Sequence, residues 1–194
     1  MKYDKDKYNR KSIRLKGYNY SQLGMYFITI CCKDQISRFG EIVKGKMILN
    51  DCGKIAFNEW KSLPIRFPQM KMDALQIMPN HMHAIVNLVG ATLAVAPIPV
   101  APIPVARDFQ GEEGAAARAA RTVDSALLGD IIGAYKSLVA KGCLEIYKSQ
   151  KEIMGKLWHR NYYEVIIRDE SNYVRIKKYI LNNPLNWKGN KSPV

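Results

Sequence analysis

The sequence predicts an α+β domain in which helices cover an antiparallel β-sheet. Residues 25–32 are rich in β-branched and aromatic side chains, which is typical of a central strand buried on both faces. Residues 71–78 and 81–88 are two further strand-like runs, separated only by the short Pro79-Asn80 turn. A turn this short favours antiparallel pairing of the strands that it joins.

A hairpin and a helix are expected between the first strand and this pair. Residues 40–49 place Gly45 between two short apolar runs, which is a hairpin signal. Asn50 or Asp51 then caps a helix that we expect to end at about residue 63, because Pro64 follows. The expected role of this helix is to cover the sheet.

The middle of the chain changes in composition. Residues 91–123 contain a tandem Ala-Pro-Ile-Pro-Val repeat and then a stretch rich in Gly, Glu, Ala and Arg. Alternating prolines lack the donors that a sheet or a helix needs, so we expect a flexible insertion that carries no chemistry. Asp124 or Ser125 then caps a second helix over residues 126–140, and residues 141–155 are expected to form a loop or a short helix.

The C-terminal part predicts one more strand and one more helix. Residues 162–167 are strand-like. Asp169 or Ser171 is expected to cap a last helix, which Pro184 closes. These two elements complete the sheet and its helical cover.

Charge and cysteine content narrow the class of protein. Lys and Arg number 30 against 17 Asp and Glu, for a formal net charge of +13. An excess of this size attracts polyanions, so nucleic acid is the first partner to consider. No apolar run approaches the roughly 18 residues of a membrane span. Four cysteines without a Cys-x-x-Cys pair, and no secretory signal, favour reduced thiols in a cytoplasmic protein.

The 194 residues suit one domain with an insertion. We expect a basic arm at residues 1–24, the domain at 25–188 and a tail at 189–194. The arm mixes Lys and Arg with Tyr, which suits phosphate contact and base stacking. Across the chain, the candidates for contact with a DNA backbone are Arg14, Lys16, Lys136, Arg160 and Arg168.

His81 and His83, two of the three histidines, stand one residue apart at the start of the second strand of the pair. Alternate residues of a strand share a face, so both imidazoles point to one side while Met82 and Ala84 take the other. Imidazole is the commonest side-chain ligand for metals, which makes the pair a candidate metal site. A pair of hydrogen-bonded histidines at a sheet edge would show the same pattern.

The last helix carries a candidate nucleophile. Tyr179 and Asn183 are four residues apart and so stand one turn apart on a single face. A phenol is a poor nucleophile at neutral pH without help from a cation or a base, and a phosphodiester needs its negative charge offset before attack. A divalent ion held by His81, His83 and the Asn183 carboxamide would meet both needs. Most helical tyrosines only pack, and this chain has 11 tyrosines.

Several short motifs, taken in their order along the chain, resemble a known family. The chain reads Met-Pro-Asn-His-Met-His-Ala-Ile-Val at 78–86, Gly-Ala-Tyr-Lys-Ser at 133–137, Trp-His-Arg-Asn-Tyr-Tyr at 158–163 and Tyr-Ile-Leu-Asn-Asn-Pro at 179–184. This ordered set resembles the single-tyrosine HUH transposases, and most closely the branch called REP-associated tyrosine transposases. The resemblance covers nearly the whole chain from residue 12 to residue 187, apart from the insertion.

The resemblance implies a ferredoxin-like core and metal-dependent DNA chemistry. It matches His81 and His83 with the family's metal-binding pair, Asn183 with the residue that completes the metal site, and Tyr179 with the nucleophile. The implied ion is Mg²⁺ or Mn²⁺. The implied substrate is single-stranded DNA with hairpins, such as REP-like palindromes, cut and rejoined through a 5′-phosphotyrosine link without ATP. The protein is expected to be a monomer or a homodimer.

Two other functions remain open on the sequence alone. A non-catalytic hairpin-DNA-binding protein would need only the basic charge, and a metal-dependent nuclease would use water while Tyr179 packs. Tyr162, Tyr163 and Tyr173 are rival nucleophiles, but they lack the Asn-Pro context and the potential ligand one turn on. His159 falls where no family ligand is expected, and we interpret it as a DNA contact or a structural residue.

Overall fold

The computed structural model describes residues 23–89 and 128–189. Within these ranges a four-stranded sheet has the order β4-β5-β1-β6, with antiparallel pairing throughout. A two-stranded hairpin, β2-β3, forms a separate small sheet. The elements are β1 Gly24–Cys31, η1 Lys33–Gln35, β2 Gly40–Val43, β3 Lys46–Leu49, α1 Asp51–Arg66, β4 Met70–Ile77, β5 His81–Leu88, α3 Leu128–Ser149, β6 Tyr163–Ile167, α4 Glu170–Asn182 and η3 Pro184–Asn186.

Some sequence predictions fall outside these residues. They are the basic arm with Arg14 and Lys16, the insertion, the Asp124 or Ser125 cap and most of the tail. In the part of the chain that the structure describes, no helix is both long enough and apolar enough to cross a membrane.

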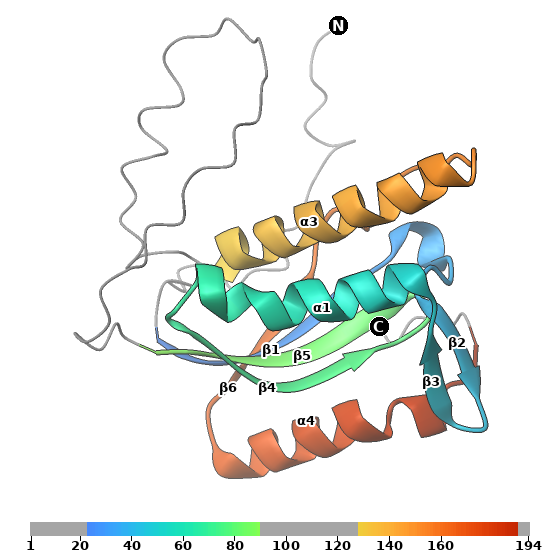
Figure 1. The fold of residues 1–194 in the computed structure, drawn as a ribbon. Coiled ribbons are helices and arrows are strands. Elements are labelled where there is room, and N and C mark those ends of the chain that lie inside the picture. The colour runs from blue at the N-terminus through green and yellow to red at the C-terminus, as the bar shows by residue number, and fades with distance from the viewer. Residues whose placement is uncertain (1–22, 90–127, 190–194) are drawn as a thin grey trace, which may run out of the picture.

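The sheet is covered on both faces, by α1 and α3 on one side and by α4 on the other (Figure 1). The larger core lies under α1 and α3, where Tyr26 and Ile28 of β1 meet the fully buried Trp60 and Tyr135. A smaller apolar cluster lies under α4 and consists of Ala74, Ile85, Ile167, Ile176 and Ile180, with Met25, Phe27 and Tyr173 packed against it. The predicted α+β fold with an antiparallel sheet is confirmed, and β1 is one of its two central strands.

Helix α1 begins where the sequence predicts but ends later. The Asn50 side chain accepts a hydrogen bond of 2.9 Å from the N–H of Gly53 and so caps the helix. The prediction that Pro64 ends it is wrong, because the helix continues to Arg66. A proline removes only its own N–H donor, and the N–H of Phe67 still donates to the Leu63 carbonyl at 2.8 Å, which closes the last turn.

Helix α3 also runs further than predicted, because residues 141–149 continue it instead of forming a loop or a separate short helix. Gly142 does not break the helix. A Cβ at this position would lie 2.9 Å from Cγ2 of Ile55 in α1, so the glycine allows the two helices to approach closely. Beyond it Cys143 is fully buried and Tyr147 packs against the core. This burial outweighs the roughly 1 kcal/mol by which glycine disfavours a helix.

Two helical glycines are expected to respond in opposite ways to substitution by alanine. A Cβ on Gly53 would lie 2.1 Å from the carbonyl oxygen of Phe39, whereas a Cβ on Gly133 would meet nothing within 4 Å. We expect Gly53→Ala to lower the free energy of unfolding by about 1–3 kcal/mol. Gly133→Ala should raise it by roughly 0.5–1 kcal/mol, because alanine favours the helix. Urea denaturation of the two variants checks this, and similar changes in both would contradict the close approach at Gly53.

Helix α4 is fixed to the sheet by a cap and a polar cluster. The Asp169 carboxylate accepts a hydrogen bond of 2.8 Å from the N–H of Asn172, as one of the two predicted caps. Further along, the Tyr173 hydroxyl donates to Asp73 of β4 at 2.6 Å and accepts from the Lys177 ammonium at 2.6 Å. Lys177 also pairs with the Asp73 carboxylate at 2.8 Å. These contacts tie the first two turns of α4 to β4.

Candidate metal and nucleophile site

His81 and His83 begin β5 and lie on the sheet face that α4 covers. Their strand neighbours Met82 and Ala84 belong to the core on the opposite face, as strand periodicity predicts. Each histidine is only 1% exposed. The two Nε2 atoms lie 3.1 Å apart, so the imidazoles converge on a single point.

Burial keeps both imidazoles neutral at pH 7. Burial lowers the pKa of His81 to about 4. Burial, with a smaller effect of the neighbouring His81, lowers the pKa of His83 to about 3. Neutral imidazole is the form that binds metal ions, so two neutral rings whose Nε2 atoms meet fit a divalent cation. Among the described residues no group of three or more His, Cys, Asp or Glu side chains is placed to hold a metal.

Tyr179 of α4 faces this pair. Its hydroxyl oxygen lies 3.4 Å from Nε2 of His83. Phe27 of β1 stacks on His83 with ring centroids 5.4 Å apart and meets the Tyr179 ring edge-on at 6.2 Å. Tyr179 itself is 42% exposed. The phenol is therefore fixed beside the histidines and still accessible to a substrate from solvent.

Asn183 follows Tyr179 by one turn and forms the C-cap of α4, where its N–H donates to the Ile180 carbonyl at 3.2 Å. It is buried, at 9% exposure. Among the described residues no hydrogen bond joins its carboxamide to His81 or His83. Trp187, just after η3, contacts the pair, with its ring centroid 5.7 Å from that of His81. The ligand role of Asn183 stays a prediction.

The chain is similar to known proteins in sequence and in structure. No family model matches the chain. An uncharacterized protein of Haemophilus influenzae is 37% identical over 186 residues, which cover 96% of this chain and 94% of the relative, and the two chains belong to one family. A solved REP-associated tyrosine transposase bound to a REP hairpin is similar over 89% of this chain and 74% of its own, with 16% identity and a TM-score of 0.53. This chain has the fold of a REP-associated tyrosine transposase. A putative transposase from Deinococcus radiodurans is 17% identical over 87% of this chain and 95% of its own, with a TM-score of 0.40.

The predicted DNA contacts occupy different parts of this transposase fold. The loop that carries Arg160 lies at the histidine end of the sheet, because the N–H of His159 donates to the carbonyl of Cys31, the strand partner of His81. Arg168 follows β6 at the opposite end, next to the partner of Met25. Arg160 and Arg168 are both exposed. Their contact with DNA stays a prediction.

Lys136 has a structural partner in the same loop. Its ammonium donates to the carbonyl oxygens of His159 and Arg160 at 2.8 and 3.0 Å. The indole N–H of Trp158 donates to the Lys136 carbonyl at 2.9 Å. Burial lowers the pKa of Lys136, against a smaller opposite effect of Cys31. These contacts favour a role in holding the loop to α3 over a direct phosphate contact.

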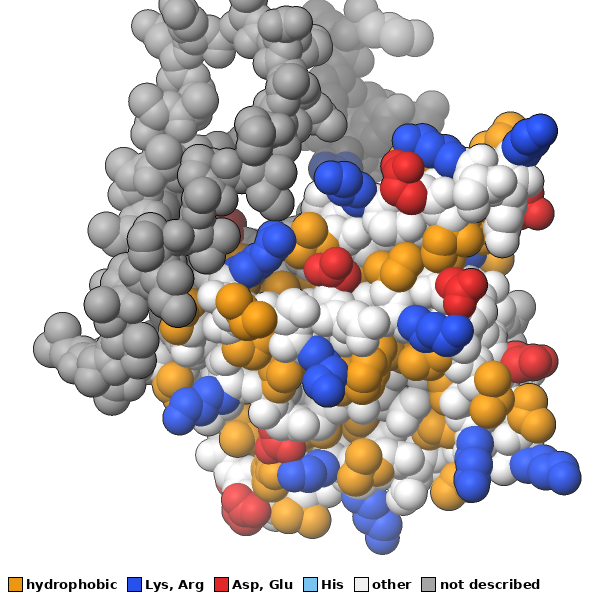
Figure 2. Space-filling view, viewed as in Figure 1, with side chains coloured by type: hydrophobic (Ala, Val, Ile, Leu, Met, Phe, Trp, Pro, Cys, Tyr) orange, Lys and Arg blue, Asp and Glu red, His pale blue; other side chains and the backbone are white. Residues whose placement is uncertain are grey.

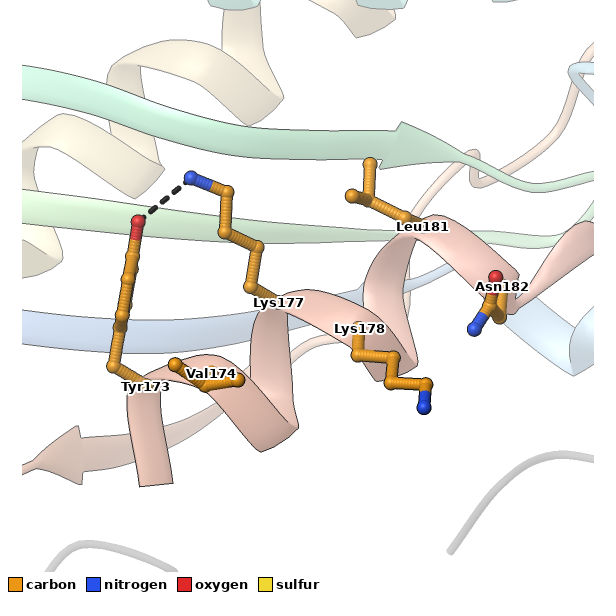
Figure 3. Close-up of a pocket in the computed structure, with 6 residues that line it drawn as sticks. All are labelled: Tyr173, Val174, Lys177, Lys178, Leu181 and Asn182. Carbon is orange, nitrogen blue, oxygen red and sulfur yellow. Dashed lines mark hydrogen bonds between the residues drawn. The ribbon is translucent and has the colours of Figure 1, made fainter. Parts of the chain in front are cut away.

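The rival tyrosine Tyr173 lies on another side of α4. It lines a shallow pocket together with Val174, Lys177, Lys178, Leu181 and Asn182, and Figure 3 shows its hydroxyl bonded to Lys177. Successive helical residues are rotated by about 100°, so the pocket lies on the side of the helix opposite Tyr179. In this chain's transposase fold the Tyr179 phenol faces the histidines, whereas the Tyr173 phenol is hydrogen-bonded to Asp73 and Lys177.

Sequence reasoning assigned no role to two residues that contact the histidines. Thr29 Oγ1 lies 2.8 Å from Nδ1 of His83, and Asn80 Oδ1 lies 2.6 Å from Nδ1 of His81. Thr29 and Asn80 are both buried. A hydroxyl in an otherwise apolar strand is the sequence signal that points to Thr29, and adjacency to the histidine pair points to Asn80.

The net positive charge does not by itself locate a path for DNA. On the face shown in Figure 2, Lys and Arg side chains are scattered over the helices with Asp and Glu among them. The geometry of the histidine pair and Tyr179 is a more specific indicator of a site than this charge distribution.

The buried histidines are expected to make the metal-free protein sensitive to acid. A histidine in the unfolded chain has a pKa near 6.5 and becomes protonated below that pH. In the folded protein the two rings have pKa values of about 4 and 3, so they stay neutral until the pH is much lower. The free energy of unfolding should fall by roughly 2 kcal/mol for each ring between pH 6.5 and pH 5. Urea denaturation at the two pH values measures this fall. The double variant His81→Leu with His83→Leu should lose most of it, and an equal fall in both proteins would contradict the assignment.

Proposed function

We propose that this protein is a metal-dependent single-stranded DNA transposase that cuts and rejoins DNA at hairpin-containing sites through a 5′-phosphotyrosine at Tyr179. One observation carries the proposal. The hydroxyl of Tyr179 lies 3.4 Å from His83 Nε2, and that atom lies 3.1 Å from His81 Nε2. A potential nucleophile, itself 42% exposed, and two neutral, buried potential ligands thus meet at one point.

The chemistry follows from this arrangement. A divalent ion, Mg²⁺ or Mn²⁺, held by His81 and His83 with Asn183 as a further ligand, would offset the charge of the phosphodiester. The Tyr179 hydroxyl loses its proton to solvent and its oxygen attacks phosphorus. The bond between phosphorus and the 3′-oxygen breaks, and that oxygen takes a proton from solvent and leaves as a 3′-hydroxyl. A 3′-hydroxyl of another strand then attacks the phosphotyrosine and releases Tyr179. One phosphoester bond is exchanged for another in each step, so no ATP is needed.

The hairpin substrate is proposed from the solved relative of the same fold, which is bound to a REP hairpin. The net charge of +13 favours a polyanionic partner. A non-catalytic hairpin-binding protein would use the same fold and charge, but it would not need a tyrosine beside two converging imidazoles. A nuclease that uses water would need the imidazoles but not the tyrosine.

A single experiment separates these functions. The protein is incubated with Mn²⁺ or Mg²⁺ and a pool of hairpin oligonucleotides labelled at the 3′ end, because a 5′-phosphotyrosine keeps the 3′ part of the strand. A denaturing gel then shows whether label migrates with protein. A metal-dependent adduct supports the proposal. Binding without an adduct across the pool favours the binding protein, and cleavage without an adduct favours attack by water.

A further inference from the structure

We propose that Asn80 and Thr29 are positioning residues that control the tautomers of the two histidines in different ways. Asn80 holds His81 in a single tautomer, whereas Thr29 allows His83 to exchange between two. The inference rests on the metal site of the proposed function. It concerns which nitrogen of each ring carries hydrogen before and after an ion binds.

The contacts of Asn80 determine the tautomer of His81. Its Nδ2 lies 3.2 Å from the Gln35 carbonyl oxygen, and a carbonyl only accepts, so the amide nitrogen must face Gln35. The amide oxygen then faces Nδ1 of His81 at 2.6 Å. Because that oxygen also only accepts, Nδ1 must carry the hydrogen. The neutral His81 ring therefore has its lone pair on Nε2 in every state of the site.

The Asn80 side chain has little freedom to leave this orientation. It is 3% exposed. Its backbone carbonyl accepts a hydrogen bond of 2.8 Å from the N–H of Cys32, and the preceding Pro79 carbonyl accepts from Arg38 and Phe39 at 2.8 and 3.0 Å. The turn before β5 is thereby tied to the segment that follows β1, and the amide is held between Gln35 and His81.

Thr29 places no such limit on His83. A hydroxyl both donates and accepts, and Thr29 Oγ1 lies 2.8 Å from Nδ1 of His83. Without an ion, a lone pair on His83 Nε2 would face the lone pair of His81 at 3.1 Å, and the two would repel. Of the two polar atoms that face His83 Nε2, Nε2 of His81 is the nearer at 3.1 Å and the Tyr179 hydroxyl is the farther at 3.4 Å. His83 therefore carries its hydrogen on Nε2 and donates it to His81, while Thr29 donates to Nδ1. The hydrogen bonds then run in one direction, from Thr29 through both rings to Asn80.

A bound cation requires the opposite arrangement at His83. Both Nε2 atoms must then present lone pairs, which His81 already does. In His83 one proton leaves Nε2 to solvent and one from solvent joins Nδ1, so the ring stays neutral. The Thr29 hydroxyl rotates and accepts from Nδ1. One hydroxyl rotor thus satisfies the ring in both states, which an apolar side chain in its place would not do.

Nitrogen-15 NMR of the wild-type protein tests the tautomers directly. With histidine labelled in both ring nitrogens, two-bond ¹⁵N–¹H correlations at pH 7.5 show which nitrogen carries hydrogen. We expect Nδ1–H for His81 and Nε2–H for His83 in the metal-free protein. Saturating Mg²⁺ should convert His83 to Nδ1–H and leave His81 unchanged. A metal-free His83 with Nδ1–H, or a His83 that keeps Nε2–H in the Mg²⁺ complex, would overturn the inference.

Substitution of Thr29 gives a second, independent readout. Mn²⁺ affinity is measured by electron paramagnetic resonance of the free ion. Thr29→Val keeps the shape of the side chain but not its hydroxyl, and it should weaken Mn²⁺ binding about 10–100-fold. Thr29→Ser should restore wild-type affinity, because only the hydroxyl is required. Equal binding by wild type and Thr29→Val would refute the positioning role.

The same titration keeps the inference separate from the metal site on which it rests. Wild type should bind Mn²⁺ and His81→Ala should not. If these two proteins behave alike, the metal site of the proposed function is wrong. If they differ as expected while Thr29→Val matches wild type, only the inference about Thr29 fails.

Discussion

Tyr179→Phe is expected to abolish the covalent protein–DNA adduct while leaving hairpin binding and Mn²⁺ binding intact. The substitution removes only the phenol oxygen, which lies 3.4 Å from His83 Nε2. The ring that meets Phe27 edge-on remains, so the surrounding packing should persist. Removing a nucleophile that acts within a catalytic unit typically lowers the rate by at least about a thousandfold. Single-turnover assays of adduct formation measure the loss.

Tyr173→Phe is the matched control, because it makes the same chemical change on the same helix. Its hydroxyl bonds to Asp73 and Lys177 rather than to the histidines. We expect a modest loss of thermal stability and nearly normal adduct formation. Adduct formation that survives Tyr179→Phe and disappears in Tyr173→Phe would transfer the nucleophile to Tyr173.

His83→Ala is expected to remove metal dependence as well as activity. His83 Nε2 is the atom that faces both His81 and Tyr179, so its loss leaves a single imidazole at the site. We expect Mn²⁺ affinity to fall at least about 100-fold and adduct formation by a factor of about a thousand or more. Hairpin binding at low Mn²⁺ should change little, because most of that affinity comes from phosphate contacts.

His159→Ala is the control for the loss of a histidine. His159 is exposed, and the contacts that it makes with Lys136 and Cys31 use its backbone. The variant should bind Mn²⁺ and form adduct like the wild type. A strong loss of Mn²⁺ affinity in His159→Ala, with normal affinity in His83→Ala, would place the metal elsewhere in the protein.

Much of the fold was predictable because the local signals and the tertiary structure agree. Residues 25–32 and 81–88 are apolar enough to be central strands, and they are the two interior strands of the sheet. The errors concern the C-terminal ends of two helices, α1 and α3. Pro64 costs α1 one donor near its end, and Gly142 serves the close approach of α3 to Ile55. The helix propensity of single residues does not include such tertiary effects.

For the site, spacing predicted which side chains share a face but not which atoms meet. The alternation of β5 placed His81 and His83 together, and the register of β1 against β5 then brought Thr29 opposite His83. That register is a long-range property, so the sequence shows a polar residue at Thr29 but not its contact with His83. The packing of α4 on the sheet likewise decides that Tyr179, rather than Tyr173, faces the pair.

The residue that carries the DNA can be identified directly in the covalent adduct. The adduct formed with a hairpin oligonucleotide and Mn²⁺ is treated with nuclease and trypsin and analysed by mass spectrometry. Cleavage after Lys and Arg places the four candidate tyrosines in three peptides: residues 161–168 with Tyr162 and Tyr163, residues 169–175 with Tyr173, and residues 179–188 with Tyr179. We expect a nucleotide linked through its 5′-phosphate to peptide 179–188, whose only tyrosine is Tyr179. A modified peptide 161–168 or 169–175, or metal-dependent cleavage with all three peptides unmodified, would contradict the role of Tyr179 as the nucleophile.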